Sequence, residues 1–218
     1  MLVKICCVSS TEEAEVALAH GADALGLVSE MPSGPGIIPE SLISEIATTI
    51  GDRAHSVLLT SLTHPRAVAD QFGRCTVNTL QLCNWLPGTA RRTLRSLLPH
   101  AFIIQVVHVT GAETFDKARR SQDHIDALLL DSGTPTGATP ELGGTGRTHD
   151  WSVSRQIREN VRVPVFLAGG LRACNIAEAI GSVNPYGIDV CSGVRTNGKL
   201  DQSRLRAFMA EVRRTVAV

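Results

Sequence analysis

Two glycine-rich turns are the clearest chemical feature of this sequence. Ala168-Gly169-Gly170-Leu171 follows one short apolar run, and Cys191-Ser192-Gly193-Val194 follows the next. Glycine lets backbone N–H groups come close to an anion, and the positive end of a short helix adds to the attraction. Such glycines also serve simply to make tight turns between strands and helices. Two turns of this kind at successive strands of a barrel favour a phosphate site, for which we expect Gly169, Gly170, Ser192 and Gly193.

A carboxylate followed by a long loop is the second feature. The apolar run of residues 125–130 stops at Asp131, and the residues after it show no helical or strand period as far as Gly143-Gly144-Thr145-Gly146. Compact domains seldom keep an unstructured loop of this length unless it has a function. We therefore expect Asp131 to lie at a functional site, together with Gly144 and Gly146 at the far end of the loop.

Eight short apolar runs are available to position these residues. We expect strands at residues 2–7, 23–28, 55–60, 77–82, 101–107, 125–130, 163–168 and 186–191. Apolar residues at steps of three and four between the runs indicate helices. The first helix begins at a capping box formed by Ser10 and Glu13 and ends at Gly21. Strands this apolar are typical of a parallel sheet covered on both faces. The alternation predicts an α/β fold, a (β/α)8 TIM barrel, as a single domain over residues 1–218.

A barrel of this type has its active face at the carboxyl ends of the strands. This rule selects a short set of residues at the predicted strand ends. They are Cys6, Cys7, Ser29, Thr60, Cys83, His108, Asp131, Gly169, Gly170, Cys191, Ser192 and Gly193.

Composition narrows the class of partner. Lys plus Arg and Asp plus Glu both number 21, so the formal charge is zero and neither a nucleic acid nor an acidic membrane is an expected partner. No apolar run is long enough to span a bilayer, and the first residues lack the order of a signal peptide. We expect a cytoplasmic protein whose six cysteines are reduced thiols. The spacing of cysteines and histidines does not indicate a metal site.

Motifs along nearly the whole chain match the pattern of one known family. They are Val3-Lys4-Ile5-Cys6, Gly21-Ala22-Asp23-Ala24-Leu25-Gly26, Gln81-Leu82, Leu129-Leu130-Asp131-Ser132, Gly143-Gly144-Thr145-Gly146-Arg147, Ala168-Gly169-Gly170-Leu171 and Gly187-Ile188-Asp189-Val190. One of these alone is a weak signal, whereas together they are specific. On these motifs the sequence resembles the phosphoribosylanthranilate isomerases, the barrel enzymes of the third step of tryptophan biosynthesis.

This resemblance implies an Amadori rearrangement of a small phosphorylated substrate, without a cofactor. A phosphoribosyl amine opens when an acid protonates the furanose ring oxygen, C1–O breaks and an iminium forms. A base then removes the C2 proton, and the resulting enolamine tautomerises to a 1-deoxy-ribulose phosphate. By position in the family's motifs, Asp131 is the acid and Cys6 is the base, and Asp189 matches a position that faces the substrate. Such acid–base catalysis contributes roughly 10²–10⁴-fold.

Each implied role makes a physical demand on its residue. Asp131 has to stay protonated near neutral pH, which burial at the mouth of an apolar barrel favours. The segment from Ser132 to Gly146 is expected to close over the pocket and exclude water. Cys6 has to become a thiolate, and Lys4, two residues earlier on the same side of the strand, is a nearby cation. The alternatives are an inert buried thiol at Cys6 and an ordinary ion pair at Asp189.

Four positions depart from the family's pattern. The loop Met31-Pro32-Ser33-Gly34-Pro35-Gly36-Ile37-Ile38-Pro39 has no arginine, although the family uses one there to hold the anthranilate carboxylate. Cys7 replaces a glycine, Cys83-Asn84 replaces His-Gly, and Arg195 stands where the family usually has an acid. Arg195 or a protonated His108 is a possible replacement for the missing cation, and a solvated loop residue is the alternative for Arg195.

Three interpretations of the function follow from this mixture of kept and altered motifs. The first is a phosphoribosylanthranilate isomerase with a rearranged anthranilate pocket. The second is a sibling isomerase for a different phosphoribosyl amine. The third is a catalytically silent barrel that binds a sugar phosphate, against which the presence of both Cys6 and Asp131 counts. The sequence leaves both a monomer and a homodimer open.

Overall fold

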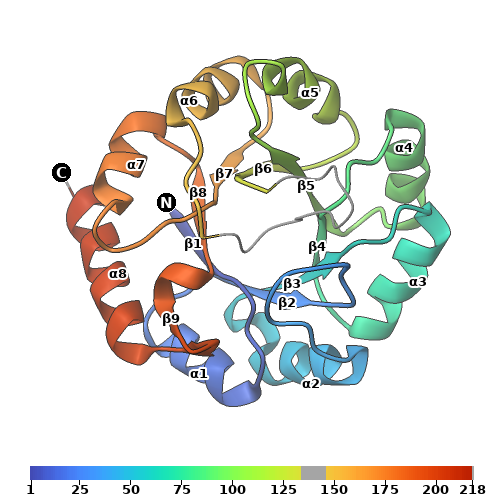
Figure 1. Cartoon of the computed structure of the whole chain (residues 1–218). Coiled ribbons are helices and arrows are strands. Elements are labelled where there is room, and N and C mark those ends of the chain that lie inside the picture. The colour runs from blue at the N-terminus through green and yellow to red at the C-terminus, as the bar shows by residue number, and fades with distance from the viewer. Residues whose placement is uncertain (134–145, 218) are drawn as a thin grey trace.

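The strands of the chain close into a parallel barrel (Figure 1). A computed structural model describes residues 1–133 and 146–217. The barrel strands are β1 (Leu2–Ile5), β2 (Ala24–Val28), β3 (His55–Thr60), β4 (Thr79–Leu82), β5 (Phe102–His108), β6 (Ala127–Asp131), β7 (Val165–Leu167) and β8 (Gly187–Val190). Because β8 pairs with β1 in parallel, no strand is left as an open edge of this sheet. The prediction of a (β/α)8 TIM barrel is confirmed, and each predicted strand is present.

Helices lie between successive strands and form a ring around the barrel (Figure 1). They are α1 (Thr11–Ala19), α2 (Glu40–Ile50), α3 (Pro65–Cys75), α4 (Gly88–Leu97), α5 (Thr114–Ser121), α6 (Trp151–Asn160), α7 (Ile176–Val183) and α8 (Gln202–Val216). Short 3₁₀ turns lie at Gly51–Arg53 and Ser192–Val194, and β9 (Arg195–Thr196) and β10 (Lys199–Leu200) form a small hairpin before α8. Among the residues described, no helix is both long and apolar enough to cross a membrane.

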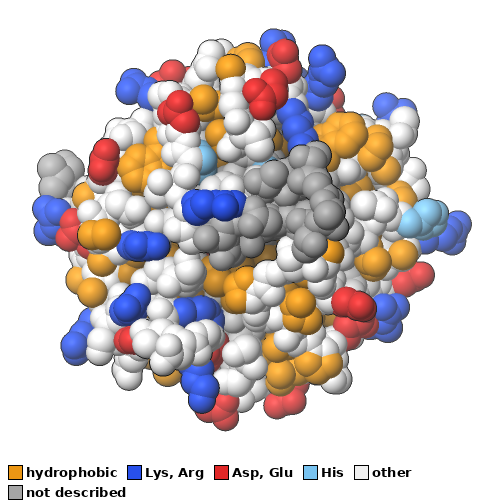
Figure 2. Space-filling view, viewed as in Figure 1, with side chains coloured by type: hydrophobic (Ala, Val, Ile, Leu, Met, Phe, Trp, Pro, Cys, Tyr) orange, Lys and Arg blue, Asp and Glu red, His pale blue; other side chains and the backbone are white. Residues whose placement is uncertain are grey.

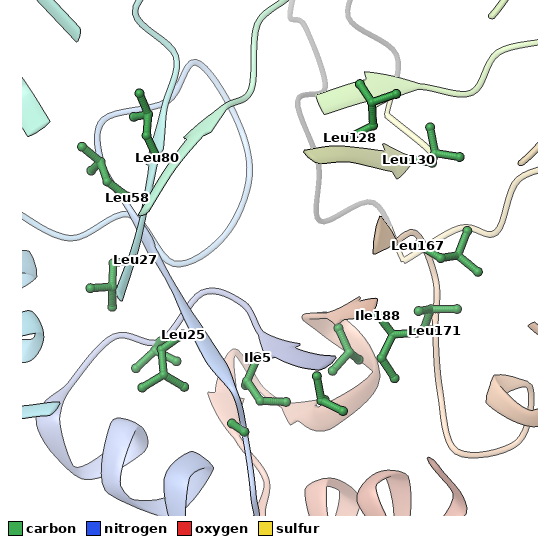
Figure 3. Close-up of a cluster of buried hydrophobic side chains, with 14 of the residues drawn as sticks. Ile5, Leu25, Leu27, Leu58, Leu80, Leu128, Leu130, Leu167, Leu171 and Ile188 are labelled. Atoms are coloured by element: carbon green, nitrogen blue, oxygen red, sulfur yellow. The ribbon is translucent and has the colours of Figure 1, made fainter. Parts of the chain in front are cut away.

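Two apolar clusters follow from the alternation of side chains along each strand. The larger one lies between the barrel and the helices, and Figure 3 shows part of it, with Leu25, Leu58, Leu128, Leu167 and Ile188 from different strands. The smaller one fills the inside of the barrel with the residues that alternate with these, such as Ala24, Val57, Leu129 and Phe166. The strands therefore read as continuous apolar runs because both of their faces are covered.

The start of α1 follows the predicted capping box only in part. The Ser10 side chain accepts a hydrogen bond from the Glu13 N–H at 3.2 Å, as expected. The Glu13 carboxylate, however, accepts from the N–H of Ser9 at 3.1 Å rather than from that of Ser10. Glu13 is also turned toward Arg195, which stands far away in the sequence. The helix ends as predicted before Gly21, whose φ of 91° is in the left-handed region.

Candidate active site

A cavity opens at the carboxyl end of the barrel, among the loops that follow the strands. The predicted site residues that line it are Cys6, Gly146, Gly169, Gly170, Asp131, Asp189 and Ser192. They come together because parallel strands of a barrel all end at the same face. Figure 2 shows this face, with Lys and Arg side chains near its centre and around its edge. Gly144, and the part of the predicted lid that covers residues 134–145, lie outside the described residues.

Cys6 lies on the inside of the barrel, next to a buried cation. A Cβ atom at Gly26 would lie 2.8 Å from Cys6 Sγ and 3.1 Å from Lys4 Nζ. The sulfur atom and the ammonium group therefore both pack against the side of Gly26 where other residues carry a side chain. Lys4 is 1% exposed and lies on β1, two residues before Cys6. The Lys4 ammonium group is therefore a positive charge close to the sulfur atom of the predicted base.

Lys4 keeps its charge because it forms an ion pair inside the barrel. Its Nζ lies 2.9 Å from Asp189 Oδ2, and both side chains are buried. Burial is the largest single influence and lowers the pKa of Lys4. The charge of Asp189, its hydrogen bond to Lys4 and the neighbouring thiols Cys6 and Cys7 together outweigh burial, so the net direction is upward. The other oxygen, Asp189 Oδ1, is buried and accepts no hydrogen bond from the described residues. That oxygen therefore retains the capacity to accept a further hydrogen bond.

Asp131 is the last residue of β6, and its carboxyl group is held largely out of water. Burial raises its pKa from 3.8 to about 6, although the N–H of Ser132 donates to Oδ1 at 2.7 Å and opposes the shift. The negative charge of Asp189 raises the pKa further, and Lys4 acts in the opposite direction. At pH 7 a group with this pKa is protonated in roughly one molecule in ten. Asp131 is thus equipped to donate a proton near neutral pH.

The turn after β7 requires glycine for reasons of both conformation and space. Gly169 and Gly170 have φ values of 83° and 62°, in the region that side chains disfavour. A Cβ at Gly170 would lie 2.6 Å from the backbone carbon of Arg147. The two glycines therefore hold the segment around Arg147 against the end of β7, and they also line the cavity. This packing explains why both are glycine, whether or not an anion is bound.

The turn after β8 comes to the same corner of the cavity. Ser192 lines it, and a Cβ at Gly146 would lie 3.3 Å from Ser192 Oγ. Gly193 stands behind Ser192, where a Cβ would lie 1.9 Å from the backbone oxygen of Leu171. Arg172, which we did not predict, donates from Nη2 to the backbone oxygen of Gly146 at 3.3 Å. The sequence feature that could have predicted Arg172 is its position directly after the glycine turn Ala168-Gly169-Gly170-Leu171.

Arg195 has a different environment from the one expected for a carboxylate contact. It is 8% exposed and forms an ion pair with Glu13, with Nη2 2.9 Å from Oε2. Its terminal nitrogens also donate to the backbone oxygens of Cys6, Cys7 and Gly198. Since these bonds engage both terminal nitrogens, and Arg195 does not line the described cavity, the arrangement does not support contact with a substrate carboxylate. Arg195 instead joins β1 to α1.

His108 lies at the strand end at which it was predicted, and Asp23 lies directly before β2. His108 ends β5 directly opposite Asp131 in the strand register, so the two side chains are on the same face of the sheet. It is buried but is not among the described residues that line the cavity, and its contact with a carboxylate stays a prediction. Asp23 lies at the other end of the barrel, where its Oδ2 accepts from the N–H of Val3 at 2.8 Å. This hydrogen bond joins the residue before β2 to β1.

Cys7 and Cys191 bring further thiols to the cavity, beside Cys6. Cys7 has a φ of 63°, a conformation that favours glycine, which explains why glycine suits this position in the family's pattern. Its Sγ lies 2.9 Å from the Sγ of Cys191, which follows β8. Cys83 lines the cavity from the end of β4. In the sequence, these cysteines could be assigned to the site only because each lies at the end of a predicted strand.

Residues 67–211 match the model of a protein family described as N-(5'phosphoribosyl)anthranilate (PRA) isomerase. The chain belongs to this family. An N-(5'-phosphoribosyl)anthranilate isomerase of Methanocella arvoryzae is 35% identical over 98% of both chains. The structure of an N-(5'-phosphoribosyl)anthranilate isomerase from Pyrococcus furiosus covers all of both chains, with 28% identity and a TM-score of 0.80. A structure of a phosphoribosyl anthranilate isomerase in complex with reduced 1-(o-carboxyphenylamino)-1-deoxyribulose 5-phosphate, 25% identical, also covers both chains and has a TM-score of 0.80.

The loop after β2 is the part of the cavity that departs from the family's pattern. Met31, Ser33, Gly34 and Pro35 line the cavity from this loop. Among the described residues that line it, none is an arginine or a lysine. The resemblance to the family's motifs therefore includes the predicted acid, the predicted base and the glycine turns, while this side of the cavity offers mainly apolar surface.

Proposed function

We propose that this protein is an N-(5'-phosphoribosyl)anthranilate isomerase, an intramolecular oxidoreductase that converts an aldose amine into a ketose amine. The observation that carries the proposal is the meeting of two residues in one cavity: Cys6, directly after β1, and Asp131, at the end of β6. Binding alone requires neither a thiol base nor a protonated carboxylic acid. Family membership and the full-length matches support the same reaction.

The first chemical step is ring opening, and Asp131 is the residue suited to it. Its carboxylic acid donates a proton to the furanose oxygen, the C1–O bond breaks, and the nitrogen lone pair forms the iminium. The raised pKa makes the proton available near neutral pH, and the Ser132 N–H stabilises the carboxylate that remains. The negative carboxylate then faces the new positive charge across the cavity, which lowers the energy of the intermediate.

The second step is removal of the C2 proton, and Cys6 is the residue suited to it. Its thiolate takes the proton while the Lys4 ammonium group stabilises the sulfur charge before transfer. Electrons of the C2–H bond flow into C1–C2, and the enolamine that forms tautomerises to the ketone. Asp189 Oδ1 accepts a hydrogen bond from a ribose hydroxyl and so fixes the sugar relative to the sulfur.

The phosphate group of the substrate is placed at the turns after β7 and β8. Gly169, Gly170 and Ser192 line the cavity at these turns, where backbone N–H groups and the Ser192 hydroxyl are donors suited to a phosphate. Arg172 supplies a positive charge at the rim, next to Gly146. Binding at this corner directs the sugar toward Asp131 and Cys6. The solved family member with a carboxyphenylamino deoxyribulose phosphate supports a phosphorylated ligand in this fold.

The anthranilate group is placed on the apolar side, against the loop after β2. Val28, Met31, Pro35 and Leu59 give the ring an apolar surface. Without an arginine in the described lining, the carboxylate of the substrate contributes less to binding than it does with a bidentate fork. The cytoplasm is the proposed compartment, since all six cysteines are free thiols and one of them is the proposed base.

A substrate comparison tests this function. The wild-type protein is given phosphoribosylanthranilate, whose loss is followed by fluorescence, and phosphoribosyl amines with other amino groups, whose ketose products are measured by chromatography. We expect turnover of phosphoribosylanthranilate at a kcat/KM at least 100-fold above that for the other amines. Preference for another amine would overturn the substrate assignment. Binding of ribose phosphates without turnover of any amine would overturn the enzymatic function.

A further inference from the structure

Two thiols that the isomerisation does not use lie in contact at the cavity. The Sγ atoms of Cys7 and Cys191 are 2.9 Å apart, and both residues line the same cavity as Cys6. Cys7 is 5% exposed, whereas Cys191 is only partly buried and is reachable from the cavity. Cys7 and Cys191 are therefore two sulfur atoms placed for a covalent bond.

The backbone at this point is compatible with a disulfide. Cys7 follows β1 and Cys191 follows β8, and these strands are neighbours, with Ile5 opposite Val190 and the Cys6 N–H donating to Val190 O at 2.8 Å. In this register Cys7 lies one residue past the position opposite Cys191. With strands about 4.8 Å apart and a rise of about 3.3 Å per residue, the two Cα atoms are expected roughly 5.8 Å apart, and disulfides join Cα atoms roughly 4.4–6.8 Å apart. The two sulfurs need to approach each other by only about 0.9 Å to reach the bond length of a disulfide.

We propose that Cys7 and Cys191 form an oxidisable dithiol, and that a peroxide converts it to a disulfide which arrests the isomerase. This inference rests on the proposed function only for the arrest, because the bond itself forms whatever reaction the cavity catalyses. The proposal gives a role to Cys7 and Cys191, two thiols in the turns after β1 and β8 that the proposed isomerisation does not require. The disulfide is reversible with an added dithiol.

Charge at this corner makes Cys191 the sulfur that reacts first. Contact with Cys7 lowers the pKa of Cys191, burial opposes this direction, and the nearby charge of Arg195 reinforces it. The same contact raises the pKa of Cys7, as do its neighbour Cys6 and burial, so Cys7 holds the proton. The thiolate is the nucleophile toward peroxides.

The reaction balances in two steps. The Cys191 thiolate attacks one oxygen of hydrogen peroxide, the O–O bond breaks, and a sulfenic acid and hydroxide form. The Cys7 sulfur then attacks the sulfenic sulfur, the S–O bond breaks, and the S–S bond forms. The leaving hydroxide takes the Cys7 proton and departs as water. Two electrons pass from the two sulfurs to the peroxide, which ends as two water molecules once the first hydroxide is protonated.

The disulfide affects catalysis through the residues next to the two cysteines. Cys7 is the next residue in the chain after Cys6, the proposed base. Cys191 directly precedes Ser192 in the glycine turn after β8. A displacement of about 1 Å in a catalytic arrangement costs up to roughly 100-fold in rate. We therefore expect turnover of phosphoribosylanthranilate to fall between 10-fold and 100-fold on oxidation, and to return after treatment with dithiothreitol.

The test compares oxidised with reduced protein for each of three chains. Wild type, Cys7→Gly and the control Cys174→Ser are treated with hydrogen peroxide, and each is compared with its own reduced form. Cys7→Gly is the variant that folds, since glycine suits the φ of 63° at this position. Cys174 is the exposed cysteine, so Cys174→Ser tests whether exposure alone decides reactivity. Peptide mapping without reductant identifies the bond independently of any activity.

In wild type and in Cys174→Ser we expect a cross-linked pair of peptides that contain Cys7 and Cys191, with a mass lower by two hydrogens than that of the two reduced peptides. In both chains isomerase activity should be lost on oxidation and should return on reduction. Cys7→Gly should form no cross-link at this site and should not show the reversible arrest. A map with oxidised Cys6 or Cys174 and no bond between Cys7 and Cys191 would overturn the proposal. The same reversible arrest in Cys7→Gly would also overturn it. If the wild type forms the cross-link but has no isomerase activity in the oxidised or the reduced form, the proposed function would be refuted, whereas the proposal of an oxidisable dithiol would still hold.

Discussion

Replacement of Asp131 by asparagine should stabilise the protein at high pH while it removes activity. The pKa of Asp131 is raised from 3.8 to about 6 in the folded chain, mainly by burial. Since the folded state binds the proton more tightly than the unfolded state, the stability linked to this proton is fully present below 3.8 and is lost as the pH rises through about 6. Asparagine is neutral throughout and its Oδ1 can still accept from the Ser132 N–H, which is 2.7 Å from the carboxylate oxygen.

The magnitude follows from the two pKa values. Each pKa unit corresponds to about 1.4 kcal/mol, so the folded wild type loses roughly 3 kcal/mol from this group across the whole titration and about 2 kcal/mol between pH 4.5 and pH 8. The free energy of unfolding of Asp131→Asn, measured by urea denaturation relative to wild type, should therefore rise by about 2 kcal/mol over this interval. The Cys75→Ala variant, changed on α3 far from the cavity, should show no such pH dependence. A difference between Asp131→Asn and wild type that is flat with pH, or that falls, would refute the reasoning.

Three further substitutions probe the surroundings of the site. Lys4→Met leaves Asp189 buried without its partner, and we expect a loss of about 3–5 kcal/mol in urea denaturation; a loss below 1 kcal/mol would contradict the buried pair. Arg195→Lys weakens the contacts with Glu13 and the β1 turn, so kcat should fall several-fold while KM for phosphoribosylanthranilate stays within twofold; a tenfold rise in KM alone would restore Arg195 as a carboxylate contact. Gly170→Ala crowds the backbone of Arg147, and thermal unfolding should show a loss above about 1 kcal/mol with weaker binding of inorganic phosphate; unchanged binding would contradict the placement of the phosphate.

The positions of the predicted acid and base followed from a rule that acts over the whole chain. Apolar runs mark parallel strands, and parallel strands in a barrel end at one face, so residues at the ends of runs meet whatever their separation in sequence. Cys6 and Asp131 line one cavity for this reason. Asp189 joins them because β8 closes onto β1, with Lys4 opposite Asp189 in the register.

Contacts that depend on loops and on side-chain direction were beyond the sequence. The capping box of α1 gave Glu13 a local role, and only the fold reveals that its carboxylate also binds Arg195 after β8. The contact between Cys7 and Cys191 depends on the left-handed backbone at Cys7, which no apolar pattern encodes for a residue other than glycine. Strand periodicity fixes the face on which a residue lies, whereas these contacts are fixed by the turns that follow the strands.

The central claim is that Cys6 and Asp131 are the base and the acid of one isomerisation. The most direct measurement is the kcat of the wild type, Cys6→Ala, Asp131→Asn and the control Cys75→Ala with saturating phosphoribosylanthranilate. We predict a loss of about 100-fold or more in each of the two cavity variants, with the control within twofold of wild type. A kcat within threefold of wild type in either Cys6→Ala or Asp131→Asn would contradict the account.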